Sequence, residues 1–326
     1  MIVQPTPENL ERAAQRLRDG LLVAFPTETV YGLGADARNP AAIARLYAAK
    51  RRPATHPVIV HLASVAALSA WAVDIPDAAR ALAAAFWPGP LTLLLKRAPG
   101  VLDEVTGGQS SIGLRMPSHP VARQLLRLFA GDEGGIAAPS ANRFGRISAT
   151  TAQHVDQDFG DELALVIDGG PCDLGIESTI VDLSREEPMS LRPGAIGAEA
   201  IAAVLGRPLS AADSSAPRVS GSLAAHYAPK TRARLLAKDA LAAALADMMR
   251  PGAHICVLAH DNAQPLGFAG TWLDMPPQSG PYAQQLYGNL RALDAVEADE
   301  IWIESPPEGP EWHAVHDRLR RATHRD

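Results

Sequence analysis

Apolar and polar residues alternate in short blocks along the first two-thirds of the chain, and these blocks predict strands and helices in turn. Short apolar runs that end at proline, glycine or polar turns predict strands over 21–27, 58–63, 91–96 and 111–117. Strands that run into loops are predicted over 135–142, 164–170 and 178–183. Apolar residues at helical spacing predict helices over 8–18, 40–49, 78–86, 121–129 and 198–205. We therefore expect a mixed α/β domain over residues 1–205.

The sequence changes character after this region. Residues 206–231 are rich in proline, serine, alanine and glycine and have no period, which predicts a linker. A second alternation follows, with strands predicted over 232–236, 254–260, 271–275 and 300–305 and helices over 239–249, 281–293 and 311–323. This order predicts a smaller domain over 232–326, built on a parallel, Rossmann-like sheet with covering helices.

Composition and charge narrow the functional classes. The 326 residues are 47% hydrophobic and 20% charged, which is ordinary for a globular protein. A net charge of -6 argues against a dedicated nucleic-acid binder, although it allows a local basic groove. We expect no membrane span and no secretion signal. Two cysteines, Cys172 and Cys256, make neither a disulfide framework nor a zinc site, so we expect a cytoplasmic protein.

Residues 25–37 form the first of several polar segments. Thr29 and Tyr31 precede Gly32 and Gly34 there. Glycines let the backbone approach a ligand closely, and hydroxyl groups can orient that ligand. Taken alone, the segment fits a polar turn between a strand and a helix equally well.

Cations follow the helix predicted over 40–49. Lys50 and Arg52 would complement the dipole of a solvated helix end, which is the simpler interpretation in isolation. However, His56 and His61 come close behind, and His61 stands in a strand that we expect to be buried. This combination favours a ligand site.

Residues 138–151 form a loop rich in serine, asparagine, glycine and arginine. Ser140 and Asn142 are two apart, so on an extended segment both point the same way. Such a loop can hold phosphate oxygens through hydroxyl, amide and backbone N–H groups. It is not a P-loop, because the GxxxxGK[ST] pattern is absent.

Arg115 and Arg192 stand at strand ends before prolines. The planar guanidinium suits a carboxylate or a phosphate, although for one arginine alone a surface ion pair is the simpler interpretation. Spaced carboxylates over 167–182 suggest Mg²⁺, held mainly by substrate phosphates because the EF-hand spacing is missing. With no catalytic triad and no obvious cysteine nucleophile, these segments favour positioning and charge stabilisation over covalent catalysis.

Taken in order, the motifs resemble those of a known family. They are PTETVYGLGADA, KRRP, PVIVHL, WPGPLTLLL, IGLRMP, APSAN, IDGG, ESTIVD and LRPGAI, with HYAPKT and EWHAVHDRLRRA further on. The chain strongly resembles the YrdC-domain proteins, the threonylcarbamoyl-AMP synthases, in their longer two-domain form. The resemblance implies that the N-terminal domain has a YrdC-like mixed twisted sheet with helices and a central cleft.

A reaction is implied by the same resemblance. L-threonine and bicarbonate form N-carboxythreonine and water, and N-carboxythreonine then attacks the α-phosphorus of ATP to yield L-threonylcarbamoyladenylate and pyrophosphate. Mg²⁺ would be held mainly by the ATP phosphates and water. A partner transferase of the Kae/TsaD type then modifies the adenosine beside the anticodon of ANN-decoding tRNAs. A transient contact between this chain and tRNA is an expectation of the same kind.

Candidate ligand-binding residues follow from the family's motif positions. Those for ATP are Lys50, Arg52, His56, Ser111, Ser140, Asn142, Ser148, Arg192 and Tyr227. Those for L-threonine are Thr29, Tyr31, His61, Arg115, Ala138 and Ser178. No metal ligand is assigned. APSAN replaces the commoner TSAN, so a contact at Ala138 must use the backbone, whereas PTET replaces PTDT and keeps the charge.

His226 and Tyr227 lie in the linker. As a lid over the cleft, this linker would exclude water from a mixed anhydride that hydrolyses. Two other interpretations remain open. The YrdC-like domain could hold structured RNA without chemistry, or the chain could be a carbamoyl-transfer enzyme of the kind that shares this domain. The overall acidity of the chain argues against RNA binding, and the lack of a zinc-finger cysteine pattern argues against carbamoyl transfer.

Overall fold

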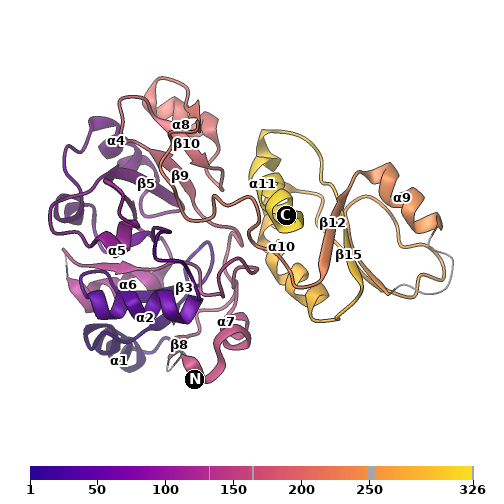
Figure 1. The fold of residues 1–326 in the computed structure, drawn as a ribbon, viewed down its shortest axis with the longest axis horizontal. Coiled ribbons are helices and arrows are strands. Elements are labelled where there is room, and N and C mark those ends of the chain that lie inside the picture. The colour runs from indigo at the N-terminus through magenta and orange to yellow at the C-terminus, as the bar shows by residue number, and fades with distance from the viewer. Residues whose placement is uncertain (132, 164, 248–253, 325–326) are drawn as a thin grey trace. The chain divides into compact units, whose positions relative to one another are not determined.

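The computed structural model describes residues 1–131, 133–163, 165–247 and 254–324 (Figure 1). These residues form two compact units. The first holds Met1–Phe144, Ser148–Asp173 and Glu177–Ser222, and the second holds Gly145–Ile147, Leu174–Ile176 and Leu223–Asp326. Residues 206–222 of the predicted linker thus belong to the first unit, and residues 223–231 belong to the second.

A mixed, eleven-stranded sheet forms the centre of the described part of the first unit. In spatial order its strands are β1 (Ile2–Val3), β8 (Val166–Ile167), β2 (Val23–Phe25), β3 (Gly32–Asp36), β7 (Gly135–Ala137), β4 (Val60–Leu62), β6 (Ser111–Arg115), β5 (Leu91–Lys96), β9 (Thr179–Asp182), β10 (Met189–Arg192) and β11 (Ser210–Ala211). The sheet contains parallel pairs, such as β4–β6 and β5–β9, and antiparallel pairs, such as β5–β6. The mixed α/β class predicted for this region is confirmed.

Helices of the first unit cover both faces of this sheet. They are α1 (Pro7–Arg18), α2 (Pro40–Lys50), α3 (Leu68–Trp71), α4 (Asp77–Phe86), α5 (Asp103–Thr106), α6 (Pro120–Ala130), α7 (Ala152–Phe159) and α8 (Ala198–Leu205), with short 3-10 turns at Val65–Ala67 and Gly160–Glu162. Val23 and Phe25 of β2 pack in one apolar cluster with α1 and α6, whereas Ala24 packs in the other. Successive strand residues face opposite sides, so both faces of β2 are buried.

Local sequence explains why α2 ends where the candidate cations begin. Asn39 caps its N-terminus by accepting hydrogen bonds from the N–H groups of Ala41 and Ala42, and Pro40 occupies the first turn. At the other end Arg51 adopts the left-handed conformation with φ 52°, which stops the helix. Lys50 therefore lies in the last turn of α2 and Arg52 lies just beyond it.

The second unit contains a four-stranded sheet within its described residues, in the order β12 (Arg232–Leu236), β15 (Glu300–Glu304), β13 (Ile255–Ala259) and β14 (Thr271–Asp274). All its strand pairs are parallel, as predicted. Its helices are α9 (Lys238–Asp247), α10 (Ser279–Asp294) and α11 (His313–Thr323), with a 3-10 turn at Pro310–Trp312. The end of the helix predicted over 239–249 lies outside the described residues, as does the first residue of the strand and loop predicted over 164–170.

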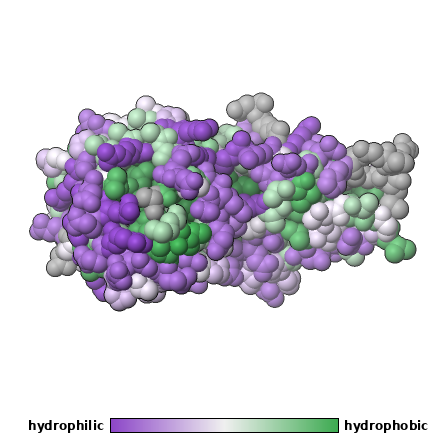
Figure 2. Space-filling model, turned by 90° about the horizontal axis from the view of Figure 1, so that it is seen from below, coloured by the Kyte–Doolittle hydropathy of each residue, from purple (hydrophilic) through white to green (hydrophobic). Residues whose placement is uncertain are grey.

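Hydrophilic residues cover much of the face shown in Figure 2, with apolar residues gathered in smaller areas between them. Among the helices that the structure describes, none is both long enough and apolar enough to cross a membrane.

Candidate active site

Lys50 joins the end of α2 to the serine- and asparagine-bearing loop that follows β7. Its Nζ donates to the carbonyl oxygens of Ser140 and Asn142, each at 2.5 Å. The side chain is buried, and burial, followed by the charge of Arg52, holds the pKa of Lys50 well below its ordinary value. A phosphate group beside it would favour the charged form. The predicted residues Lys50, Ser140 and Asn142 are thus brought together.

Arg52 and His56 form a second group next to this loop. Arg52 donates from Nη2 to the Pro57 carbonyl at 2.7 Å, and its guanidinium lies 5.4 Å from the centre of the Phe144 ring. The His56 ring meets the same phenylalanine edge-on, at 5.2 Å between centroids. Burial, together with Arg52 and Arg218, lowers the pKa of His56, so its imidazole is neutral at pH 7.

Tyr31 fixes the PTET segment against two other predicted motifs. Its backbone carbonyl accepts from the N–H of Ala141 at 2.7 Å, and its N–H donates to the Ala149 carbonyl at 2.8 Å. Its buried hydroxyl donates to the Gly170 carbonyl at 2.8 Å and accepts from the N–H of Gly169 at 3.2 Å. Burial raises the pKa of this phenol well above its ordinary value. These contacts assign Tyr31 a framework role, and its predicted contact with threonine stays a prediction.

Arg115 is a buried cation at the end of β6. Its Nη2 donates to Glu28 Oε1 at 2.7 Å, and its Nε donates to the Gly89 carbonyl at 3.3 Å. Glu28 Oε2 also accepts from the N–H of Ser118 at 3.1 Å. Both partners of this ion pair are almost wholly buried, since their side chains are 5% and 6% exposed.

His61 stands beside Arg115 because β4 and β6 pair in parallel with these two residues in register. The ring is buried and meets Phe25 edge-on, at 6.4 Å between centroids. Burial, followed by the charge of Arg115, lowers the pKa of His61 to about 3. Its Nδ1 has no hydrogen-bond partner among the described residues, so a neutral imidazole offers a nitrogen to a ligand here.

Ser178 and Arg192 connect the predicted threonine side to the predicted nucleotide side. Arg192 donates from Nη2 to Ser178 Oγ at 3.1 Å and from Nη1 to the Ser220 carbonyl at 2.7 Å. The Oγ of Ser220 in turn accepts from Arg52 Nη2 at 3.5 Å. Ser178 also shares a hydrogen bond with Thr92 at 2.8 Å between their hydroxyl oxygens. The two arginines assigned to ATP therefore meet at one serine, and one of them holds a residue assigned to threonine.

The remaining predicted residues of the first unit occupy varied places. Thr29 is buried, with its hydroxyl 2.8 Å from that of Thr27. Ser148 donates to Glu177 Oε1 at 2.5 Å. The N–H of Ala138 already donates to the Ile59 carbonyl at 3.0 Å, so a backbone contact with a ligand would have to use its carbonyl oxygen.

Ser111 is the predicted nucleotide residue that the structure places at the other end of β6, opposite Lys96 of β5. His226 and Tyr227 belong to the second unit. The N–H of His226 donates to the Arg321 carbonyl at 3.2 Å, and the Tyr227 ring stacks on Tyr287 at 5.6 Å between centroids.

Several partners in this network were not predicted from the sequence. They are Thr92, Phe144 and Ser220. Glu28 and Glu177 lie in polar segments that the sequence singled out, but neither was assigned the partner that the structure gives it. Thr92 carried a usable signal, because it is the one hydroxyl in the otherwise apolar run LTLLL. The carboxylates spaced over 167–182 do not gather into a metal centre within the described residues, where no group of three potential ligands occurs.

Comparisons with known proteins agree along the chain. A family model described as "Telomere recombination", covering Sua5, YciO and YrdC, matches residues 15–194, and one described as "Threonylcarbamoyl-AMP synthase, C-terminal domain" matches residues 196–323. Threonylcarbamoyl-AMP synthases of Pyrococcus abyssi and Bacillus subtilis are 36% and 37% identical to this chain, covering 95% and 96% of it and 93% and 92% of the relatives. The solved structure of Pyrococcus abyssi Sua5 complexed with L-threonine is similar with a TM-score of 0.91 and 34% identity, covering 99% of this chain and 97% of that one.

Proposed function

Because this chain belongs to the threonylcarbamoyl-AMP synthase family, in its two-domain form, we propose that it makes L-threonylcarbamoyladenylate from L-threonine, bicarbonate and ATP and releases pyrophosphate. The supporting observation is the meeting of Arg52 and Arg192 at Ser220, with Arg192 also bonded to Ser178. A phosphate between the two arginines would lie beside the residue assigned to threonine. That neighbourhood is what an attack of a threonine derivative on a phosphorus atom requires.

Threonine recognition is proposed for the group around Arg115. The guanidinium suits the amino-acid carboxylate, and Glu28 fixes its orientation. His61 stays neutral at pH 7 because its pKa is about 3, so its nitrogen accepts a hydrogen bond from the amino acid without adding a second positive charge. Ser178 would hold the carbamate end of the substrate.

Phosphate binding is proposed for Lys50, Arg52 and Arg192. As the carbamate oxygen attacks the α-phosphorus and pyrophosphate departs, these cations would stabilise the negative charge on the phosphate oxygens. Burial makes each interaction stronger than it would be in water. Mg²⁺, held mainly by the ATP phosphates and water, would add to the charge stabilisation that these cations supply.

Further parts of the proposal extend beyond this site. His226 and Tyr227 would help exclude water from the adenylate, and the product would pass to a threonylcarbamoyl transferase of the Kae/TsaD type that acts on tRNA. We place the reaction in the cytoplasm, where ATP and tRNA are available.

The test is to incubate the full chain with labelled bicarbonate, L-threonine, ATP and Mg²⁺, and to measure labelled adenylate and pyrophosphate. We expect label in the nucleotide that depends on threonine and is lost in Lys50→Ala and Arg52→Ala. Arg51→Gln is the matched control, because Arg51 is an exposed cation between the two and should keep activity. Adenylate formed without threonine would instead indicate carbamoyl transfer, and bound RNA without any adenylate would indicate a binding module.

A further inference from the structure

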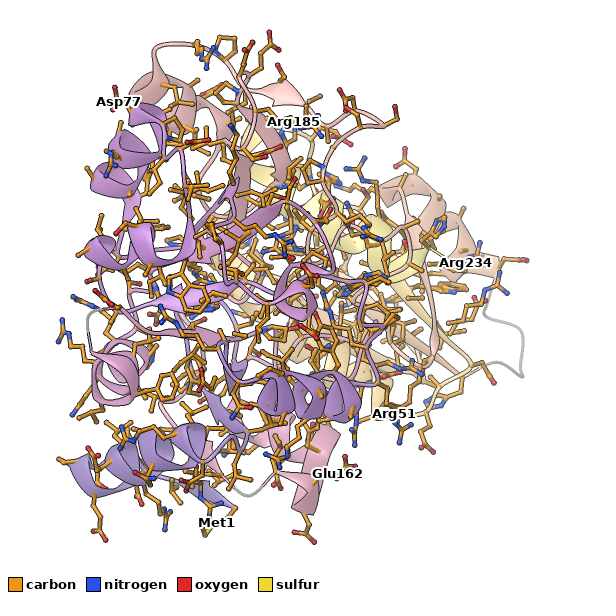
Figure 3. The ribbon with its side chains drawn as sticks, turned by 60° about the vertical axis from the view of Figure 1, so that its left-hand side comes forward. Met1, Arg51, Asp77, Glu162, Arg185 and Arg234 are labelled. Carbon is orange, nitrogen blue, oxygen red and sulfur yellow. The ribbon has the colours of Figure 1, made fainter. Side chains whose placement is uncertain are left out.

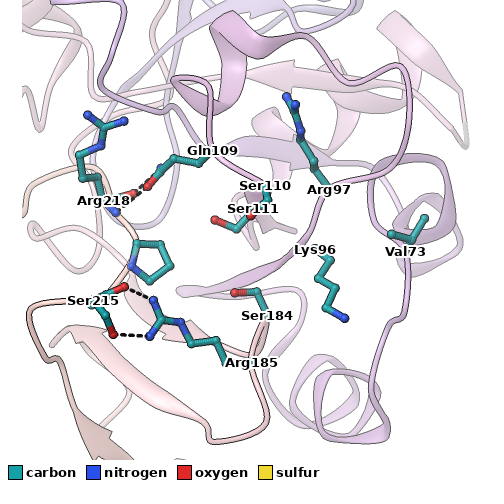
Figure 4. A pocket seen from close by; sticks show the side chains of 12 residues that line it. Val73, Lys96, Arg97, Gln109, Ser110, Ser111, Ser184, Arg185, Ser215 and Arg218 are labelled. Carbon is teal, nitrogen blue, oxygen red and sulfur yellow. Dashed lines mark hydrogen bonds between the residues drawn. The ribbon is translucent and has the colours of Figure 1, made fainter.

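A second polar pocket, of about 800 Å³, lies within the first unit (Figure 4). It is found where β5 ends at Lys96, where β6 begins at Ser111, and just after β9 at Ser184. Arg115 is at the opposite end of β6, so the pocket is separated from the threonine-side group by the length of that strand. Its volume is in the range of small-molecule sites.

Hydrogen-bond donors dominate the lining of this pocket. The cations are Lys96, Arg97, Arg185 and Arg218, and the hydroxyl groups are those of Ser110, Ser111, Ser184 and Ser215. None of the lining residues, all of which the structure describes, is acidic or aromatic. In a protein with a net charge of -6, a lining with four cations and no carboxylate indicates an anion site.

Carboxylates outside the lining hold most of these cations in place. Asp74 lies 3.2 Å from Lys96, Asp103 pairs with Arg97, and Asp182 lies 3.5 Å from Arg185. They also offset part of the charge, so binding must come from converging donors as well as from net charge. Each guanidinium keeps further N–H groups, because an arginine side chain carries several of them in a fork.

Of the four cations that line the described pocket, Arg218 is the one for which no ion pair with a described carboxylate is found. Its Nη2 donates to the Gly107 carbonyl at 3.2 Å, and Gln109 accepts from its backbone N–H at 2.8 Å. The segment that carries it is fastened to the pocket wall by Arg185, which donates to Ser215 Oγ at 2.9 Å (Figure 4). An anion here would therefore meet an uncompensated charge on a segment already held in position.

This pocket also borders the candidate phosphate residues, and it shares one residue assigned to ATP, because Ser111 belongs to its lining. Arg218 is close enough to contribute to the lowered pKa of His56, after burial and Arg52. Two residues further on, Ser220 contacts Arg52 and Arg192. Away from that border the pocket extends to Arg185, which lies far from Arg51 at the end of α2 (Figure 3).

We propose that this pocket binds a small phosphoanion and receives the pyrophosphate released by the reaction. Phosphate oxygens suit forked guanidinium groups and hydroxyl donors together. The absence of an aromatic ring among its described lining residues argues for a phosphoanion without a base, since bases stack on such rings. The phosphoanion site is inferred from the lining residues alone. That the bound anion is pyrophosphate from the reaction rests on the proposed function.

The test is calorimetric titration of the full chain with inorganic pyrophosphate, in the wild type and in Lys50→Ala, which weakens the candidate ATP site. We expect a pyrophosphate site that persists in Lys50→Ala. Adding Lys96→Gln and Arg185→Gln should weaken it at least tenfold, because each substitution removes a charged hydrogen-bond donor worth about tenfold in affinity. The matched control Arg12→Gln/Arg80→Gln removes the same charge at exposed positions elsewhere in the first unit and should leave the affinity unchanged.

The proposal would be overturned if Arg12→Gln/Arg80→Gln lowered the affinity for pyrophosphate as much as the pocket substitutions do. It would also be overturned if the pocket substitutions left that affinity unchanged. Lys96→Glu is a second variant, at a side chain that is 54% exposed, so folding should be unaffected. It should also lower the affinity for pyrophosphate.

The titration does not require the chain to turn over its substrates. A chain that binds pyrophosphate in this pocket but makes no adenylate would therefore refute the proposed function and keep the site. Unchanged product inhibition by pyrophosphate in an active pocket variant would instead refute the link to the reaction.

Discussion

Glu28 and Arg115, 87 residues apart in the chain, form an ion pair of 2.7 Å that is almost wholly buried. The pair joins the PTET segment before β3 to the end of β6. A buried pair of this kind gives weak evidence for stability, because desolvation offsets much of the Coulomb attraction. It fixes the direction of the guanidinium, however, and a fixed guanidinium is what bidentate recognition of a carboxylate needs.

Replacing Glu28 with glutamine should therefore impair threonine binding. We expect Glu28→Gln to raise the KM for threonine at least about tenfold, because Arg115 loses its charged partner and its orientation. The KM for ATP should change by less than about twofold. Unfolding free energy should also fall by roughly 3 kcal/mol, since a buried charge is left uncompensated.

Glu28→Asp is the control, because it keeps the carboxylate in the pattern that is commoner in the family. It should recover most of the threonine affinity. If both variants bind threonine as the wild type does, Glu28 has no part in positioning Arg115.

Arg192 should couple the two substrates in a way that Arg115 does not. It donates both to Ser178, on the predicted threonine side, and to Ser220, where Arg52 also contacts the chain. We expect Arg192→Gln to raise the KM for both ATP and threonine by about tenfold, whereas Arg115→Gln should affect threonine alone. Steady-state kinetics with each substrate varied in turn distinguishes the two. An effect of Arg192→Gln on one substrate alone would contradict this connection.

His61 should remain neutral through the physiological range. Its folded-state pKa of about 3 lies below the ordinary value of 6.5, so the unfolded chain binds one more proton between these values. The contribution of His61 to the free energy of unfolding is therefore fully present above about pH 6.5. Below that pH the free energy of unfolding falls by roughly 1 kcal/mol for each pH unit. Denaturant unfolding at about pH 7 and about pH 5 should show a larger loss in the wild type than in His61→Gln. A His61 imidazole that titrates above about pH 5 by NMR would contradict this prediction.

Strands with a continuous apolar run were predicted well from the sequence. The run LTLLLK gave the bounds of β5, Leu91–Lys96, because a fully buried strand needs no alternation. By contrast β3, Gly32–Asp36, was expected to be a turn, since glycine disfavours strands. A Cβ at Gly34 would lie 2.8 Å from the Phe25 ring, so this strand forms through close packing that no local pattern reveals.

In the candidate site, too, local patterns predicted the elements but not the contacts between distant segments. The helix end at Lys50 was predictable from spacing, but its contact with a loop 90 residues away was not, because register between distant strands is set by the whole sheet. Residues 138–151 were expected to form a loop after a short apolar strand, and the structure confirms this loop between β7 and α7. In the structure β7 ends at Ala137, since Pro139 has no N–H to donate to a neighbouring strand. The loop formed this way is what carries Ser140 and Asn142.

Thr92 gives a direct test of a residue that only the structure assigns to the site. Its hydroxyl oxygen lies 2.8 Å from that of Ser178, and its side chain is fully buried. Thr92→Val keeps the shape and removes the hydrogen bond, so Ser178 retains Arg192 but loses its bond to Thr92. We expect the KM for threonine to rise about fivefold, as one neutral hydrogen bond would predict. Thr106→Val is the matched control, because Thr106 is also buried and hydrogen-bonded but lies on α5. An equal rise in both variants would mean that the effect comes from reduced stability, and no rise in either would remove Thr92 from the site.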